Sequence, residues 1–142
     1  MLNKDYIVGL VDGEGSFTAY IINPSEVISR KRRVKAEPKF CLKLIEKDKD
    51  ILYALKKFFG CGNVYFQKDS RKNHQNCYRY EVTKRRDLEN IIIPFFQSNS
   101  PRLLSKKKDF VLFCEIIREI KKGNHLNREG LIKIYNLKKQ MH

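Results

Sequence analysis

The stretch Ile7-Val8-Gly9-Leu10-Val11-Asp12-Gly13-Glu14-Gly15-Ser16-Phe17 decides how this chain folds. Its apolar residues recur at the spacing of an amphipathic helix, whereas the residues from Ser16 onward alternate as a strand does. The pattern therefore predicts a helix that ends near Gly15, in an ordinary glycine C-cap, and runs directly into a strand.

Two acids stand at the end of this helix, where the helix dipole is negative. A carboxylate there is disfavoured by roughly 0.3–1 kcal/mol, and lysine or arginine would be the stabilising choice. A divalent cation between the acids and a phosphate explains the arrangement, and hard oxygen ligands suit magnesium. Residues two apart on a helix point in different directions. Asp12 and Glu14 therefore need not share a metal ion, and we expect Asp12 to accept backbone N–H groups instead.

Size and charge narrow the class of partner. The 142 residues, 42% of them hydrophobic, predict a single domain over residues 1–142. A net charge of +14 favours a polyanionic partner, most simply nucleic acid. We expect no membrane partner, since no apolar run approaches the ~20 residues that span a bilayer. The four cysteines lack CxxC spacing, which argues against a zinc site.

The remaining periodicity predicts an α+β domain, an antiparallel sheet with helices on one face. Strands are expected over residues 16–22, 39–44, 64–67 and 77–82. A helix is expected to run to about Phe59 with Phe58 in its buried stripe, a second to follow Arg86 and end at Pro94, a third to open at Ser105, and a last one to include 131–137.

The outward face of this sheet is predicted to be polar and basic, and an antiparallel ribbon fits the major groove of B-DNA. The expected DNA contacts on the strands are Thr18, Tyr20, Lys39, Lys43, Tyr65, Gln67 and Arg79. The facing of Tyr78 and Tyr80 stays open. A basic run supplies expected phosphate contacts, which position a protein without specifying sequence, at Arg30, Arg32 and Arg33.

The segment Gly9–Gly15 resembles the signature of the LAGLIDADG homing endonucleases, which reads Gly-hydrophobic-hydrophobic-Asp-small-acid-Gly. Glu14 stands where the family has its metal-binding acid, usually aspartate. The single copy resembles the homodimeric branch of the family. The resemblance implies an αββαββα fold with a saddle-shaped sheet. It also implies a magnesium-dependent, site-specific double-strand DNA endonuclease of intron homing, with two or more Mg²⁺ per dimer site.

Site residues also follow from the resemblance. Glu14 and the carbonyl of Gly13 would bind metal, while Gly9, Gly13 and Asp12 would lie at the dimer interface. Lys106 matches a family lysine that stabilises transition-state charge. Glu46, or else Lys47, falls where the family often has a glutamine that organises water. Glu46 is equally well interpreted as an acid favoured at a helix start.

Two other functions stay open. A non-cleaving binder of the same fold, an intron RNA maturase or a DNA-binding regulator, would have no need of an acid at position 14. A generic basic RNA-binding domain would explain the charge but neither Gly9 nor Gly13. All of these functions imply an intracellular protein, in an organelle (chloroplast or mitochondrion) or a prokaryotic cytoplasm.

Overall fold

The computed structural model describes residues 2–27, 34–99 and 102–142. The expected phosphate contacts Arg30, Arg32 and Arg33 lie outside the described residues. The chain begins with helix α1 (Lys4–Glu14), which Asn3 caps by accepting the N–H of Tyr6 at 2.9 Å. Strand β1 (Gly15–Ile21) follows without a loop.

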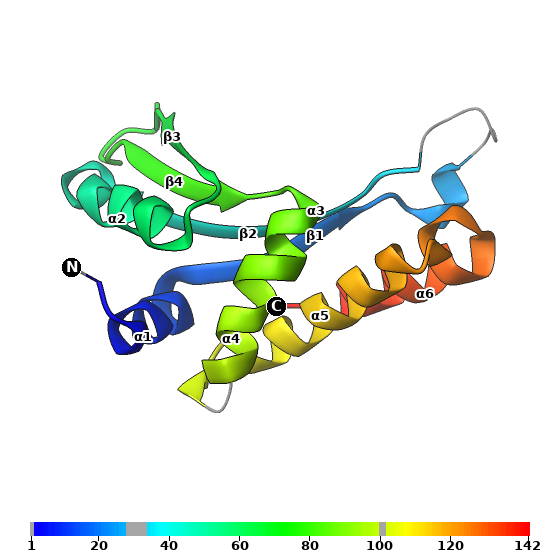
Figure 1. Ribbon diagram of the computed structural model, residues 1–142. Helices are drawn as coiled ribbons and strands as arrows, with labels where there is room; N and C mark the ends of the chain where they lie inside the picture. Colours follow the sequence, from blue (N-terminus) through cyan, green and yellow to red (C-terminus); the bar gives the residue numbers. More distant parts are fainter. Residues whose placement is uncertain (1, 28–33, 100–101) are drawn as a thin grey trace.

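The other elements complete an α+β domain, as predicted. They are β2 (Ala36–Ile45), α2 (Lys49–Phe59), β3 (Asn63–Gln67), β4 (Cys77–Val82), α3 (Arg85–Asp87), α4 (Ile93–Asn99), α5 (Lys107–Lys121) and α6 (Arg128–Lys139), with short 3₁₀ turns at Pro24–Glu26, Glu46–Asp48 and Asn124–Leu126. The four strands form one antiparallel sheet in the order β1-β2-β4-β3. Helices α1, α4, α5 and α6 gather on one side of the strands (Figure 1).

The core lies between the sheet and these helices together with α2, which contributes Leu52, Leu55 and Phe59. Phe17 of β1 is fully buried at its centre, with its ring centroid 5.1–5.4 Å from those of four other phenylalanines. Its neighbours Ala19 and Ile21 are also buried, while Thr18 and Tyr20 point to the opposite face. This alternation confirms the predicted division into an apolar face and a polar one.

Gly15 is the C-cap of α1, as predicted, and its N–H donates to the carbonyl oxygen of Val11, but its conformation is not the one typical of a glycine cap. Its φ of −80° and ψ of 167° are extended rather than left-handed. Glycine is required for a different reason, because a Cβ there would lie 2.7 Å from Cγ1 of Val11 and 2.8 Å from its carbonyl oxygen. Because it has no Cβ, Gly15 lets the backbone at the start of β1 pass close to Val11 of α1.

Three helix predictions were wrong in detail. Phe58 is 41% exposed, and Phe59 completes the buried stripe of α2 instead. The helical segment after β4 does not end at Pro94 but continues through it. Proline cannot donate a backbone hydrogen bond. A π-helical turn at Leu88–Ile92, just before Pro94, changes the hydrogen-bond pattern of the helix at this point. Helix α5 begins at Lys107 rather than at Ser105. The residues just before it are hydrogen-bonded to α1.

Candidate functional site

The C-terminal end of α1 is joined to the segment that precedes α5. The Oδ1 of Asp12 accepts hydrogen bonds from the backbone N–H groups of Leu104, at 2.8 Å, and Lys106, at 3.0 Å. The ammonium group of Lys106 in turn donates a hydrogen bond to the carbonyl oxygen of Asp12, at 3.1 Å. Asp12 therefore accepts backbone N–H groups, as the sequence predicted. It also holds the ammonium group of Lys106 at a carbonyl two positions before Glu14.

A second contact holds the same segment along α1. Arg102 forms an ion pair with Asp5, in the first turn of the helix. Leu103, the next residue, is fully buried, while Leu104 is 82% exposed. The segment is thus attached at both ends of α1. Its last residue, Lys106, lies at the C-terminal end of the helix, where the negative end of the helix dipole stabilises a cation.

Glu14 is the exposed last residue of α1. Its side chain makes no hydrogen bond or ion pair with any of the residues described, although Asp12, two positions earlier, has three contacts through its side chain and carbonyl. A carboxylate left free at the negative end of a helix is poised for an external cation rather than for an internal partner.

The donor set at this helix end suits a hard cation. A carboxylate oxygen of Glu14 and the carbonyl oxygen of Gly13 are the ligand types that Mg²⁺ prefers. Within the described ranges, no three His, Cys, Asp or Glu side chains gather into a metal-binding group. Glu14 and the Gly13 carbonyl would fill only part of the coordination sphere of a cation, and further ligands would come from a second helix end and from a bound phosphate.

Glu46 lies elsewhere on the sheet. It follows β2 directly, is exposed, and uses its backbone N–H to donate to the carbonyl oxygen of Asn76 at 3.1 Å. With Lys47 and the residues 74–76 it lines an open hollow. Among the residues described, neither Glu14 nor Lys106 makes a hydrogen bond or ion pair with Glu46. One chain does not by itself assemble the three predicted catalytic residues.

The predicted contact residues share the polar face of the sheet. Cross-strand pairing places Thr18 opposite Lys39, and Arg79 opposite both Lys43 and Tyr65. Tyr20 and Tyr65 are 57% and 42% exposed. Two cations directly opposite one another destabilise a sheet unless an anion covers them. Glu81 offsets part of the charge of the Lys43–Arg79 pair, and a polyanion on this face would offset the rest.

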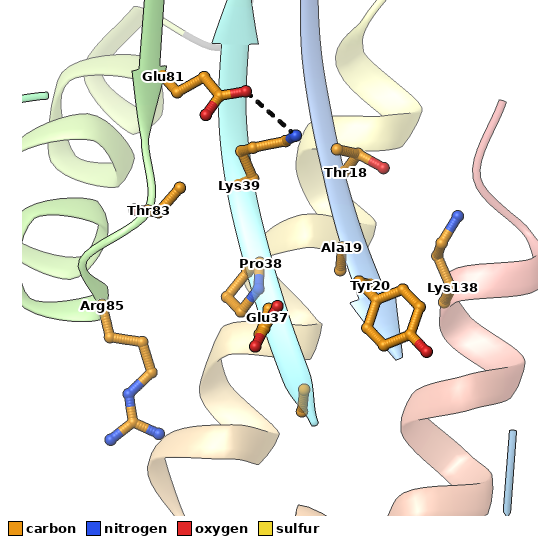
Figure 2. Close-up of a pocket in the computed structure, with 11 residues that line it drawn as sticks. Thr18, Ala19, Tyr20, Glu37, Pro38, Lys39, Glu81, Thr83, Arg85 and Lys138 are labelled. Atoms are coloured by element: carbon orange, nitrogen blue, oxygen red, sulfur yellow. Dashed lines mark hydrogen bonds and ion pairs between the residues drawn. The ribbon is translucent and has the colours of Figure 1, made fainter. Parts of the chain in front are cut away.

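The same face carries a groove that extends beyond these residues. It has a volume of about 730 Å³ and is entered by side chains from three strands and two helices. Figure 2 shows Thr18, Tyr20 and Glu37 on its floor, and Lys138 of α6 and Arg85 of α3 on opposite sides. Sequence reasoning missed the two flanking cations, because nothing local in the sequence indicates that the ends of α3 and α6 approach the strands.

The tyrosines of β4 both belong to the helix side of the sheet. Tyr80 is fully buried and donates its hydroxyl to the carbonyl of Cys61 at 2.7 Å. Tyr78 packs against Phe66 and lies under the ammonium group of Lys49. Neither faces the groove. On the polar face, burial raises the pKa of the Cys41 thiol, so this side chain is no thiolate nucleophile at neutral pH.

The glycines of α1 form an open patch. Gly9 and Gly13 lie four residues apart on one face of the helix, and in the described part of the chain a Cβ on either would meet nothing within 4 Å. The fold of one chain therefore does not require glycine at these positions, in contrast to Gly15.

A basic antiparallel sheet that follows a helix ending in an exposed carboxylate, within an αββαββα order, is the homing-endonuclease architecture. The model of the family described as LAGLIDADG endonuclease matches residues 7–117. The chain belongs to this family.

Curated relatives agree with this assignment. A probable intron-encoded endonuclease 3 of Neurospora crassa is 34% identical over 134 residues, which are 94% of this chain and 23% of that protein. The homing endonuclease I-ApeII of Aeropyrum pernix is 27% identical over 116 residues, 82% of this chain and 63% of that one. The chain spans about a quarter of the length of the fungal intron-encoded relatives it matches.

Solved structures share the fold. The homing endonuclease I-TnaI superposes with a TM-score of 0.82 at 36% identity, covering 99% of this chain and 88% of that one. The meganuclease I-SmaMI, bound to uncleavable DNA, superposes with a TM-score of 0.82 at 31% identity, covering 99% of this chain and 45% of that one. No helix in the described part of the chain is long and apolar enough to cross a membrane.

Proposed function

We propose that the chain is a site-specific double-strand DNA endonuclease of intron homing that works as a homodimer with Mg²⁺. The observation that carries this proposal is the end of α1, where Glu14 is exposed and its side chain has no partner among the described residues, while Asp12, two positions earlier, holds Lys106. The names of relatives, which include intron-encoded and homing endonucleases, and the DNA bound by I-SmaMI support it.

Two copies of the chain are needed in this proposal, because one chain supplies one such carboxylate. The open patch at Gly9 and Gly13 would let two α1 helices approach closely about a twofold axis. A twofold interface brings the two Glu14 side chains together and predicts a near-palindromic DNA target. The polar sheet faces of the two copies would then extend along the duplex, with their basic residues on phosphates and base edges.

Each proposed site residue has a separate task. Glu14 and the Gly13 carbonyl would hold Mg²⁺, which when bound neutralises phosphate charge and makes water more acidic. Lys106, whose ammonium is fixed on the Asp12 carbonyl, would stabilise the negative charge that develops on the phosphate. Glu46 would orient water if the DNA brings it toward the cleavage site.

The test is cleavage of a plasmid that carries the intron-insertion junction of the gene encoding this chain. Cutting in Mg²⁺, and none in EDTA, is the expected result. Glu14→Gln should bind the same DNA without cutting it, whereas Glu26→Gln, the same change at an exposed acid beyond β1, should cut like the parent chain. Native cutting by Glu14→Gln would rule the mechanism out. Specific binding without cutting by the parent chain would instead favour a non-cleaving binder of DNA or intron RNA.

A further inference from the structure

Arg79 lies on the polar face of the sheet, and its side chain is held from three directions. Its Nε is 2.9 Å from Oε1 of Glu81, as an ion pair. Its Nη1 donates to Oε1 of Gln67 at 3.3 Å, and its guanidinium carbon lies 5.2 Å from the centroid of the Tyr65 ring. The plane of the guanidinium is therefore fixed by neighbouring side chains before any ligand binds.

Most of the hydrogen-bonding capacity of Arg79 is still free. A guanidinium has five N–H donors in a rigid fork. Among the residues described, the side chain of Arg79 makes one hydrogen bond, from Nη1. Its Nε is within ion-pair distance of Glu81 but forms no hydrogen bond. A fixed, partly exposed fork with free donors matches the two adjacent acceptors, O6 and N7, that guanine presents in the major groove.

Glu81 adds a negative charge to a surface whose basic residues attract a polyanion. Its side chain is only 13% exposed, and its Oε1 is shared between the Nε of Arg79 and the Nζ of Lys39, at 3.3 Å. Figure 2 shows the Lys39–Glu81 contact at the edge of the groove. A carboxylate here repels DNA phosphates, and its Oε1 is already shared by two cations. Its effect is therefore exerted on the neighbouring cations.

The cross-strand neighbours explain why such an anion is needed. Lys43 is directly opposite Arg79, and like charges in this position repel. Without Glu81, the guanidinium would move away from Lys43 toward solvent and lose its fixed direction. The carboxylate of Glu81 thus keeps the guanidinium of Arg79 over the ring of Tyr65, in one fixed position on the sheet.

We propose that Glu81 is a positioning residue which, with Gln67 and Tyr65, aims Arg79 at a single guanine of the DNA target. This chain would then require a G·C pair at the position that Arg79 reaches in each half of its site. The inference rests on the proposed function, since it assumes that the polar face binds duplex DNA.

The experiment selects bound duplexes from a randomised DNA library in EDTA, so that no strand is cut, and sequences them. The chains compared are the parent, Arg79→Lys, Glu81→Ala and the control Glu37→Ala. Glu37 carries the same charge on the same face and lines the same groove, but makes no ion pair among the described residues. Melting curves identify any variant that fails to fold, in which case Glu81→Gln replaces Glu81→Ala.

The parent chain should enrich guanine at one position in each half of the selected sequence. Arg79→Lys keeps the charge but not the fork, and should reduce this preference roughly 10- to 100-fold. Glu81→Ala should lose the same preference while binding unselected DNA as tightly as the parent or more so, because it removes a negative charge. Glu37→Ala should also bind unselected DNA more tightly, but it should keep the preference for guanine. A simple loss of stability would not relax one position alone.

Two failures are distinguishable. If the parent chain enriches a sequence but Arg79→Lys and Glu81→Ala select the same bases as the parent, the assignment of Arg79 and Glu81 is overturned. If the parent chain enriches no sequence at all, the proposed function itself fails.

Discussion

Asp12 and Lys106, 94 positions apart in the chain, hold each other through both backbone and side chain. The carboxylate of Asp12 accepts the N–H of Lys106, and the ammonium of Lys106 donates to the carbonyl of Asp12. This reciprocal contact gives the acid at the unfavourable end of α1 an internal partner. It also explains how a lysine on a segment without regular structure reaches the candidate active site.

Asp12→Ala should therefore damage the fold and the site together. It leaves the N–H groups of Leu104 and Lys106 without their acceptor, which typically costs about 1–3 kcal/mol of unfolding free energy. Asp12→Asn keeps an acceptor oxygen and should lose much less. Urea unfolding measures both, and DNA cleavage at a temperature where both variants are folded should fall further for alanine. Equal stability of Asp12→Ala and the parent would show that the contact contributes nothing.

Lys106→Met tests the proposed charge stabilisation at the phosphate. The variant keeps the length of the side chain and the backbone hydrogen bond to Asp12, but has no ammonium group. Cleavage should slow by roughly 100-fold or more, as when one transition-state donor is removed, with DNA affinity changed far less. Lys107→Met removes a neighbouring charge from an exposed residue and is the matched control. Equal rates for the two variants would exclude a special role for Lys106.

Local sequence patterns were sufficient to predict the order of helices and strands, though not every helix boundary, and to predict which strand residues lie on each face of the sheet. The alternation around Phe17 and Phe40 defined the core side, and Lys39, Lys43 and Arg79 fell on the polar side as predicted. Contacts between distant segments could not be predicted in the same way. Neither the partners of Asp12 nor the approach of Arg85 and Lys138 to the groove has a local signal, because tertiary packing alone creates them.

The start of α5 shows the same limit. Ser105 is a good N-cap residue by type, and the sequence therefore predicted a helix from this position. In the structure the N–H groups of Leu104 and Lys106 are already bonded to Asp12, and the helix begins only afterwards. A long-range hydrogen bond prevailed over a local capping preference.

The pairing of α5 with α6 should depend on pH through Glu119. Hydrogen bonds from Asn124 and then Lys133 lower the pKa of this carboxyl below its ordinary value of 4.5. A depressed pKa stabilises the fold above the unfolded value, and this stabilisation is lost as pH falls through the folded pKa. Urea unfolding between pH 6 and pH 3 should therefore show a smaller loss for Glu119→Gln than for the parent. Glu115→Gln, on the same helix, should behave like the parent chain.

The proposed dimer makes opposite predictions for two glycines of one segment. Gly9→Ala should stabilise the isolated chain by about 0.5–1 kcal/mol, since alanine favours a helix and its Cβ meets nothing within 4 Å. The same methyl group should obstruct a second α1 helix and weaken dimerisation by about 1–3 kcal/mol. Gly15→Ala should instead destabilise the chain itself, because its Cβ would lie 2.7 Å from Cγ1 of Val11. Sedimentation equilibrium measures association, and urea unfolding at concentrations that favour monomer measures the fold. If Gly9→Ala dimerises as tightly as the parent chain, α1 is not the interface.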